Sequence, residues 1–244
     1  DEVKEAHNRE VVKSVHDQAT ETAKKVNIIM SKSQELKALG LFPKVAGLAR
    51  KVHDSTTLQE KFEKTVIYKR GEDSQKRRLN QCVPTCWNSD FACLHTHLQF
   101  KEEVQLFTTQ INLLDYALTS AQWKLADHLV PVLEIFNEVT NLFSKANVPL
   151  IYEVIPMLKH LEHALDQIYN AKDEPPVIWI AAQAALQVVG KYYALTDDNE
   201  VCHIAIIMCP EKKLKWFKKN LDWHERDHME AKRIVQQRWD ESYA

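Results

Sequence analysis

The chain has 244 residues, 45% of them apolar, so its composition excludes a disordered chain and favours a sizeable hydrophobic core. Its 32 Lys and Arg residues are balanced by 34 Asp and Glu residues, which gives a net charge of −2. A uniformly basic nucleic-acid-binding domain is therefore excluded, and any such site must be a local patch.

Three helices are predicted in the first quarter of the chain. Apolar residues recur at helical spacing through residues 1–39, which predicts one long amphipathic helix. A second helix is predicted over residues 43–53 and a third over residues 58–68. Ser55 or Thr56 can cap the third helix, because each is followed within a few residues by Gln or Glu.

A polar, basic segment, residues 69–84, is predicted to link an N-terminal helical segment (1–68) to a larger helical domain (85–244). A charge run of this kind is typical of a solvated loop, and contact with phosphates is the alternative. The candidate phosphate contacts in this segment are Lys69, Arg70, Arg77 and Arg78.

The larger domain is predicted to begin with a helix for which Thr85 and Ser89 are candidate caps. Its apolar positions are Phe91, Leu94, Leu98, Val104 and Phe107. Three further helices are predicted between residues 123 and 195, the last of them with Asp173 as its N-cap. With only 4 glycines in the chain, these patterns predict an all-α fold, an elongated bundle of about eight or nine helices.

Lysines alternate with aromatic residues in the segment 210–220. At helical spacing its aromatic side chains are predicted to face the core and its lysines to face water. Lys212 and Lys215 are candidate nucleic-acid contacts, because a strip that combines basic and aromatic residues can bind a nucleic acid.

A last helix is predicted over residues 223–243, and it begins with a H-E-x-x-H pattern in which His224 and His228 lie one helical turn apart. Two such histidines can bind zinc while the glutamate polarises a water molecule. Charged residues lie between the histidines and no third ligand follows, so a salt-bridged, solvent-facing helix is the preferred interpretation. We therefore expect no metal or other cofactor, and we expect the chain to fold without metal.

The order and spacing of residues in the larger domain resemble the catalytic-region helices of hAT-family DNA transposases, the hobo and Activator group. The residues that carry this resemblance include Trp123, Leu133, Phe136, Ile155, Pro156, Tyr192, Tyr193, Pro210, Trp216 and Phe217. The resemblance implies a helical domain of transposase ancestry.

A second part of the resemblance is the Thr-Arg-Trp-Asn-Ser motif of that family, which Thr85, Trp87, Asn88 and Ser89 match. In the family the tryptophan stacks on a flipped base beside a DNA hairpin, so the resemblance gives Trp87 that role, with Asn88 beside it. Cys86 stands where the family has arginine, and Cys82 where it usually has aspartate. Because both departures remove charge from a phosphate-facing site, Trp87 has a second interpretation, a core aromatic that anchors the helix start.

The family cuts and joins DNA with three carboxylates that hold two metal ions. Two of these lie on strands upstream of the helical region and the third in a later glutamate motif. Neither feature is found in this sequence, and Glu10, Asp197 and Asp198 do not replace them. The resemblance therefore implies no catalytic residue and no transposition by the isolated chain.

Three functions follow as hypotheses. The first is a transposase-derived helical domain that binds nucleic acid or protein, with DNA binding that is weak and salt-dependent. The alternative is a domesticated interaction or effector protein without DNA contact. A zinc metallopeptidase built on the H-E-x-x-H pattern is a third hypothesis. The odd number of cysteines, 5, suits reduced thiols in the nucleus or cytoplasm, and no run of about 18 apolar residues supports a membrane partner.

Overall fold

A computed structural model gives the structure of the chain. The residues that it describes are 2–83, 86–145, 147–171, 174–197, 199–219 and 225–242. Predictions that concern Thr85, Asp173, Asp198 and His224 therefore lie outside the described residues.

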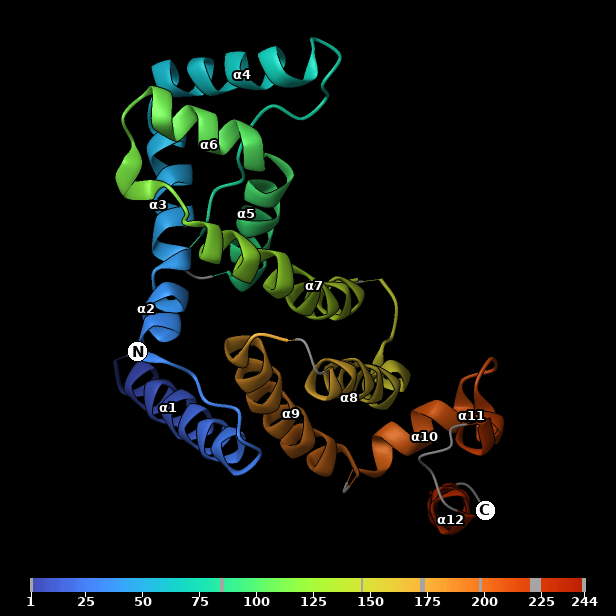
Figure 1. Cartoon of the computed structure of the whole chain (residues 1–244). Coiled ribbons are helices and arrows are strands. Elements are labelled where there is room, and N and C mark those ends of the chain that lie inside the picture. Colours follow the sequence, from blue (N-terminus) through green and yellow to red (C-terminus); the bar gives the residue numbers. More distant parts are fainter. Residues whose placement is uncertain are drawn as a thin grey trace. The chain divides into compact units, whose positions relative to one another are not determined.

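The described part of the chain is all-α, as predicted, and its only extended pairing is an isolated β-bridge between Val83 and Cys86. The α-helices, shown in Figure 1, outnumber the predicted eight or nine. They are α1 (Glu2–Lys25), α2 (Lys32–Leu39), α3 (Leu41–His53), α4 (Thr56–Arg70), α5 (Trp87–Gln99), α6 (Lys101–Gln110), α7 (Ser120–Phe143), α8 (Val154–Asn170), α9 (Pro176–Asp197), α10 (Glu200–Met208), α11 (Lys213–Lys219) and α12 (Glu225–Ser242), with 3₁₀ helices at Leu114–Tyr116 and Ile151–Glu153.

Two of the additional helices arise because predicted helices are broken. The predicted helix over residues 1–39 is divided into α1 and α2, because Asn27 adopts a left-handed conformation with φ of 61°. Ser31 then begins α2 with a complete capping box, in which its side chain and that of Gln34 each bond the other's backbone N–H. The apolar stripe predicted to run from Phe91 to Phe107 is divided into α5 and α6 at Phe100, whose ring is buried in the core.

The chain forms two compact units, which we describe separately. The α3–α6 unit comprises Ala19–Asn137 and Ala171–Ala181. The α10–α12 unit comprises Asp1–Gln18, Glu138–Asn170 and Ala182–Ala244. The basic segment 69–84, predicted as a linker between domains, lies inside the α3–α6 unit, because the helices on both sides of it share one core.

The core of the α3–α6 unit is aromatic. Phe62 of α4 packs edge-on against Phe100 and Phe107, with ring centroids 5.8 and 5.2 Å apart. Trp123 of α7 joins the same cluster and is 2% exposed. This packing holds α4 beside α6 (Figure 1). The C-terminal end of α4 therefore lies next to the start of α6, which positions the polar contacts described below.

A core cluster of the α10–α12 unit receives residues from α8, α9, α10, α11, α12 and the 3₁₀ helix Ile151–Glu153. Its buried members are Ile155, Cys202, Ile206, Phe217 and Ala231. Phe217 is fully buried and its ring is stacked on His203, at 6.2 Å. Burial of one side of α11 fixes the orientation of this short helix and leaves its lysines on the opposite side.

Candidate nucleic-acid interface

Trp87, the first residue of α5, is 41% exposed. Its ring meets Phe136 of α7 edge-on, with centroids 6.5 Å apart. The interpretation of Trp87 as a buried core anchor is therefore wrong. A core anchor would be almost fully buried, as Trp123 is. The edge contact supports the ring at one side and leaves a substantial part of it accessible to a partner.

A compact turn precedes Trp87. Ser89 Oγ accepts a hydrogen bond from Val83 N at 2.7 Å and donates to Cys86 O at 2.6 Å. Ser89 is therefore not the N-cap of α5. It lies in the first turn of the helix, and its side chain bonds the backbone of the preceding segment. The side-chain oxygen of Asn88 is buried without a hydrogen-bond partner among the described residues, whereas the residue as a whole is partly exposed. The DNA contact at Asn88 stays a prediction.

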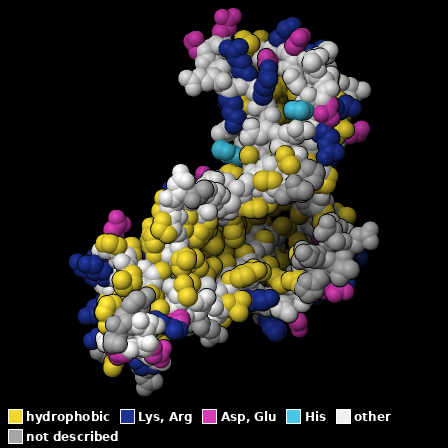
Figure 2. Space-filling view, turned by 180° about the vertical axis from the view of Figure 1, so that it is seen from behind, with side chains coloured by type: hydrophobic (Ala, Val, Ile, Leu, Met, Phe, Trp, Pro, Cys, Tyr) yellow, Lys and Arg dark blue, Asp and Glu magenta, His cyan; other side chains and the backbone are white. Residues whose placement is uncertain are grey.

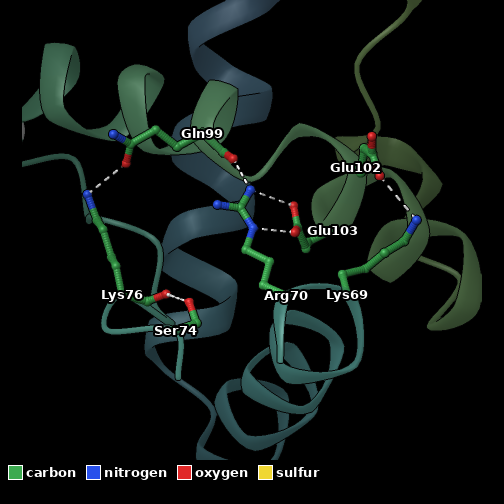
Figure 3. A network of polar contacts seen from close by, with 7 residues as sticks. All are labelled: Lys69, Arg70, Ser74, Lys76, Gln99, Glu102 and Glu103. Atoms are coloured by element: carbon green, nitrogen blue, oxygen red, sulfur yellow. Dashed lines mark hydrogen bonds and ion pairs between the residues drawn. The ribbon is translucent and has the colours of Figure 1, made fainter. Parts of the chain in front are cut away.

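The basic segment is bound to the rest of its unit by a polar network around Arg70, at the end of α4 (Figure 3). The Arg70 guanidinium donates to both carboxylate oxygens of Glu103, at 2.5 and 3.1 Å, and to the backbone oxygen of Gln99. It also lies over the Phe100 ring, 4.7 Å from its centroid. Glu103 is 3% exposed, so Arg70 compensates a buried charge.

Burial of Glu103 by itself raises the pKa of its carboxyl group, but the hydrogen bond from Arg70 and the positive charges of Arg70 and Lys69 outweigh this and leave the pKa below its ordinary value.

The remaining basic side chains also have partners within the unit. Lys69 pairs with Glu102 at 3.2 Å, Lys76 donates to Gln99 Oε1 at 3.1 Å, Arg77 donates to Ser74 O at 2.9 Å, and Arg78 pairs with Glu63 at 2.6 Å. The structure thus places the predicted phosphate contacts of segment 69–84 in internal interactions.

The basic residues of the 210–220 segment fall into two groups. Lys212 is paired with Glu153 at 2.8 Å, and both side chains are less than one-fifth exposed. Its ammonium group also lies 5.4 Å from the Tyr152 ring centroid. Lys212 therefore fastens α11 to the preceding part of its unit, and it is not free to contact a phosphate.

The second group is exposed on α11 and includes Lys215, Lys218 and Lys219, none of which has a partner among the described residues. Lys213, the first residue of α11, is also exposed. An open hollow of about 350 Å³ lies beside them, lined by Glu211, Lys212, Lys215, Trp216 and Lys219. The prediction that aromatic residues face the core and lysines face water agrees with the burial of Phe217 and the exposure of the α11 lysines. It is wrong for Lys212, whose side chain is partly buried against Glu153. Lys218 and Lys219 belong to the basic and aromatic strip over 210–220 for which phosphate contact is predicted.

Basic and acidic side chains are interspersed on the face of the molecule in Figure 2, which agrees with the near-zero net charge. None of the helices in the described part of the chain combines the length and apolar character needed to cross a membrane. Among the described side chains there is also no cluster of three or more His, Cys, Asp or Glu residues that could hold a metal ion. His228 belongs to α12, and the H-E-x-x-H pattern otherwise begins outside the described residues.

Comparison with known proteins gives limited similarity. No protein-family profile matches the chain, and no solved structure matches it. The chain is 24% identical over 139 residues to tpeD of Talaromyces stipitatus, a protein proposed to be a transcriptional regulator. The aligned segment covers 56% of this chain but only 14% of that protein, so the chain corresponds to a small part of it.

Proposed function

We propose that the chain is a non-catalytic helical domain, related to hAT-family transposases, that binds nucleic acid with unpaired bases. The proposal rests chiefly on Trp87, a large aromatic side chain that is half exposed at the start of a helix and supported edge-on by Phe136. Stacking on a base needs an accessible aromatic side chain that is held in place from another side. Trp87 has both properties.

The exposed lysines of α11, in the other unit, are a separate candidate for phosphate contact. Lys215, Lys218 and Lys219 carry positive charge that no described carboxylate neutralises. Phosphate contacts by such side chains give affinity without sequence preference. We expect the binding to be weak and salt-dependent, because few such lysines are free.

The similarity to tpeD is compatible with this proposal, since regulators of transcription commonly contact DNA. The resemblance to hAT transposases supports it through the matching tryptophan motif. The arginine of that motif is replaced by Cys86, so we assign to Trp87 a base contact only. The lysines of α11 belong to the other unit and are proposed as phosphate contacts in their own right.

The test is the affinity of the Trp87→Ala variant for a fluorescently labelled single-stranded oligothymidine and for a DNA hairpin. Stacking of one base contributes about 1–3 kcal/mol, so we expect affinity to fall by about 5- to 150-fold. The cost in stability should be about 1–2 kcal/mol, because the ring is only partly buried. The variant should therefore remain folded.

Tyr68→Ala is the matched control, because Tyr68 is an 81% exposed aromatic residue in the same unit, on α4. It should leave the affinity for both oligonucleotides unchanged. If Trp87→Ala and Tyr68→Ala bind equally well, Trp87 is not a stacking residue and the proposal fails.

A second candidate function is a protein-interaction domain without DNA contact. It is favoured by one observation: the cations of the segment 69–78 are used in internal contacts, and Cys86 replaces the motif arginine. Absence of binding to either oligonucleotide at low salt, with the wild-type protein folded by circular dichroism, would favour this second function.

A further inference from the structure

The hollow beside α11 combines an aromatic side chain with cations. Its described lining is Glu211, Lys212, Lys215, Trp216 and Lys219. Positions 212, 215, 216 and 219 are three or four residues apart, the spacing of side chains that share one face of a helix. Small-molecule sites begin at about 300 Å³, so the volume of about 350 Å³ suits one small ligand group.

Trp216 gives this hollow an aromatic wall. Its side chain is partly buried and packs against the core cluster that contains Phe217. The two rings meet edge-on, with centroids 5.1 Å apart and planes at 86°. The Trp216 ring is thus held from the core side, as Trp87 is held by Phe136, and the part of it that lines the hollow is open to a ligand.

The start of α11 is fixed in place by contacts inside its own unit. Lys212 Nζ lies 2.8 Å from Glu153 Oε2, and the backbone N–H of Trp216 donates to Lys212 O at 3.1 Å. Lys215 and Lys219 follow at positions one turn apart, and both are exposed without a described partner. Two unneutralised ammonium groups therefore stand beside the aromatic wall on an anchored helix.

We propose that this hollow seats one nucleotide of a single strand, with its base against Trp216 and its phosphate on Lys215 and Lys219. The inference deepens the proposed function and rests on it for the class of partner. Proteins that bind single strands combine cations that follow the backbone with aromatic side chains on which bases stack. Both elements occur here in one hollow, within one unit, and stacking of this kind takes any base.

Glu211, the acidic member of the described lining, narrows the choice of ligand. Its carboxylate repels a compact polyanion that offers no hydrogen-bond donor. A nucleotide within a strand carries a singly charged phosphate diester and base N–H groups, and a carboxylate accepts hydrogen bonds from such groups. The lining therefore fits a base together with one phosphate better than it fits a phosphate-rich ligand.

The experiment uses the full chain and a single-stranded oligothymidine in which 5-iodouracil replaces thymine. Long-wavelength ultraviolet light breaks the carbon–iodine bond, and the uracil C5 then bonds to an aromatic side chain that it contacts, with loss of hydrogen iodide. Cleavage after glutamate gives residues 73–102, which contain Trp87, and residues 212–225, which contain Trp216 and Trp223. Fragmentation of each cross-linked peptide identifies the joined residue, so the assignment needs no variant.

We expect a cross-link at Trp216 whose yield falls by about 2- to 5-fold in Lys215→Gln, because an exposed ion pair contributes little more than this. Lys218→Gln is the matched control, since it removes the same charge from the same helix but lies outside the described lining. It should leave the yield unchanged at physiological salt, where exposed charges more than about 8 Å apart are largely screened. Equal losses in both variants would show that only the general charge of α11 matters and would overturn the proposal.

The cross-linked peptides also separate this inference from the proposed function. Cross-links confined to residues 73–102 would overturn the site beside α11 and leave the stacking role of Trp87 intact. A cross-link at Trp216 with none at Trp87 would uphold this site and contradict that role. Cross-linking at Trp223 alone, or in neither peptide, would also overturn the site.

Discussion

Two lysine- and arginine-rich regions of the chain differ in what their charges do. In the segment 69–78, each cation described above is held by an acidic, amide or carbonyl partner, and Arg70 neutralises the buried Glu103. On α11, Lys215, Lys218 and Lys219 are exposed and have no described partner. A run of basic residues shows that positive charge is present. Whether that charge is free to contact a ligand depends on partners that are distant in the sequence. We infer that the first region stabilises the fold and that the second is the one able to contact phosphates.

The largest effect on folding within this comparison is expected from Arg70→Ala. Breaking a buried ion pair costs about 3–5 kcal/mol, and because the Arg70 side chain is 40% exposed we discount this to about 2 kcal/mol. Urea unfolding followed by circular dichroism measures the change in free energy of unfolding. A change below about 0.5 kcal/mol would mean that the network in Figure 3 is not structural.

Acidification should reduce the difference between wild type and Arg70→Ala. The lowered pKa of Glu103 contributes stability that is present above the ordinary pKa of a glutamate, about 4.5, and is lost as pH falls through the folded-state value. In Arg70→Ala the pKa of Glu103 should rise, because burial then acts with less opposition. Urea unfolding at pH 7 and at pH 4 should show the destabilisation shrinking; a constant difference would contradict this role of Glu103.

Smaller effects are expected from Lys69→Ala and Arg78→Ala. Their partners Glu102 and Glu63 are at least partly exposed, and exposed ion pairs contribute about 0–1 kcal/mol. Each substitution should lower the free energy of unfolding by about 0.5 kcal/mol or less, and less again at high salt. If either substitution lowered the free energy of unfolding as much as Arg70→Ala does, the burial of Glu103 would not explain why the Arg70–Glu103 pair is the stronger one.

The smallest effect on stability is expected from Lys215→Ala, which should leave the urea midpoint unchanged because Lys215 has no described partner. A clear destabilisation would show that α11 uses this lysine structurally. In that case the two basic regions would not differ as proposed.

Helical periodicity was sufficient to predict the all-α class and several helices, because amphipathic stripes are local patterns. Ser55 caps α4 as predicted, with Leu58 N donating to its side chain at 3.4 Å. The break at Asn27 was missed, because a single residue with positive φ leaves the apolar pattern on both sides intact. The break at Phe100 was missed for a different reason. The Phe100 ring is buried in the core, so Phe100 fits the apolar pattern of a continuous helix although the backbone turns there.

The candidate site could be predicted only in part. Trp87 was identified from the motif, but its exposure depends on Phe136, which lies 49 residues later in the sequence and supports only its edge. The partners of Arg70 and Lys69 lie 33 residues away on α6, a separation at which no periodicity links the charges. Sequence patterns therefore indicated candidate residues, and tertiary packing decides which of them are accessible.

The most direct test compares two triple variants in which the same number of charges is removed. One is Lys215→Gln with Lys218→Gln and Lys219→Gln; the other is Lys69→Gln with Lys76→Gln and Arg78→Gln. Affinity for single-stranded oligothymidine is measured over a salt series, after circular dichroism has shown each variant to be folded. We predict that the α11 variant binds more weakly and that its salt slope falls by about 2, since each lysine that neutralises a phosphate of a single strand contributes about 0.7 to the slope, whereas the other variant behaves as wild type. Weaker binding by the 69–78 variant alone, or to the same extent by both variants, would contradict this assignment.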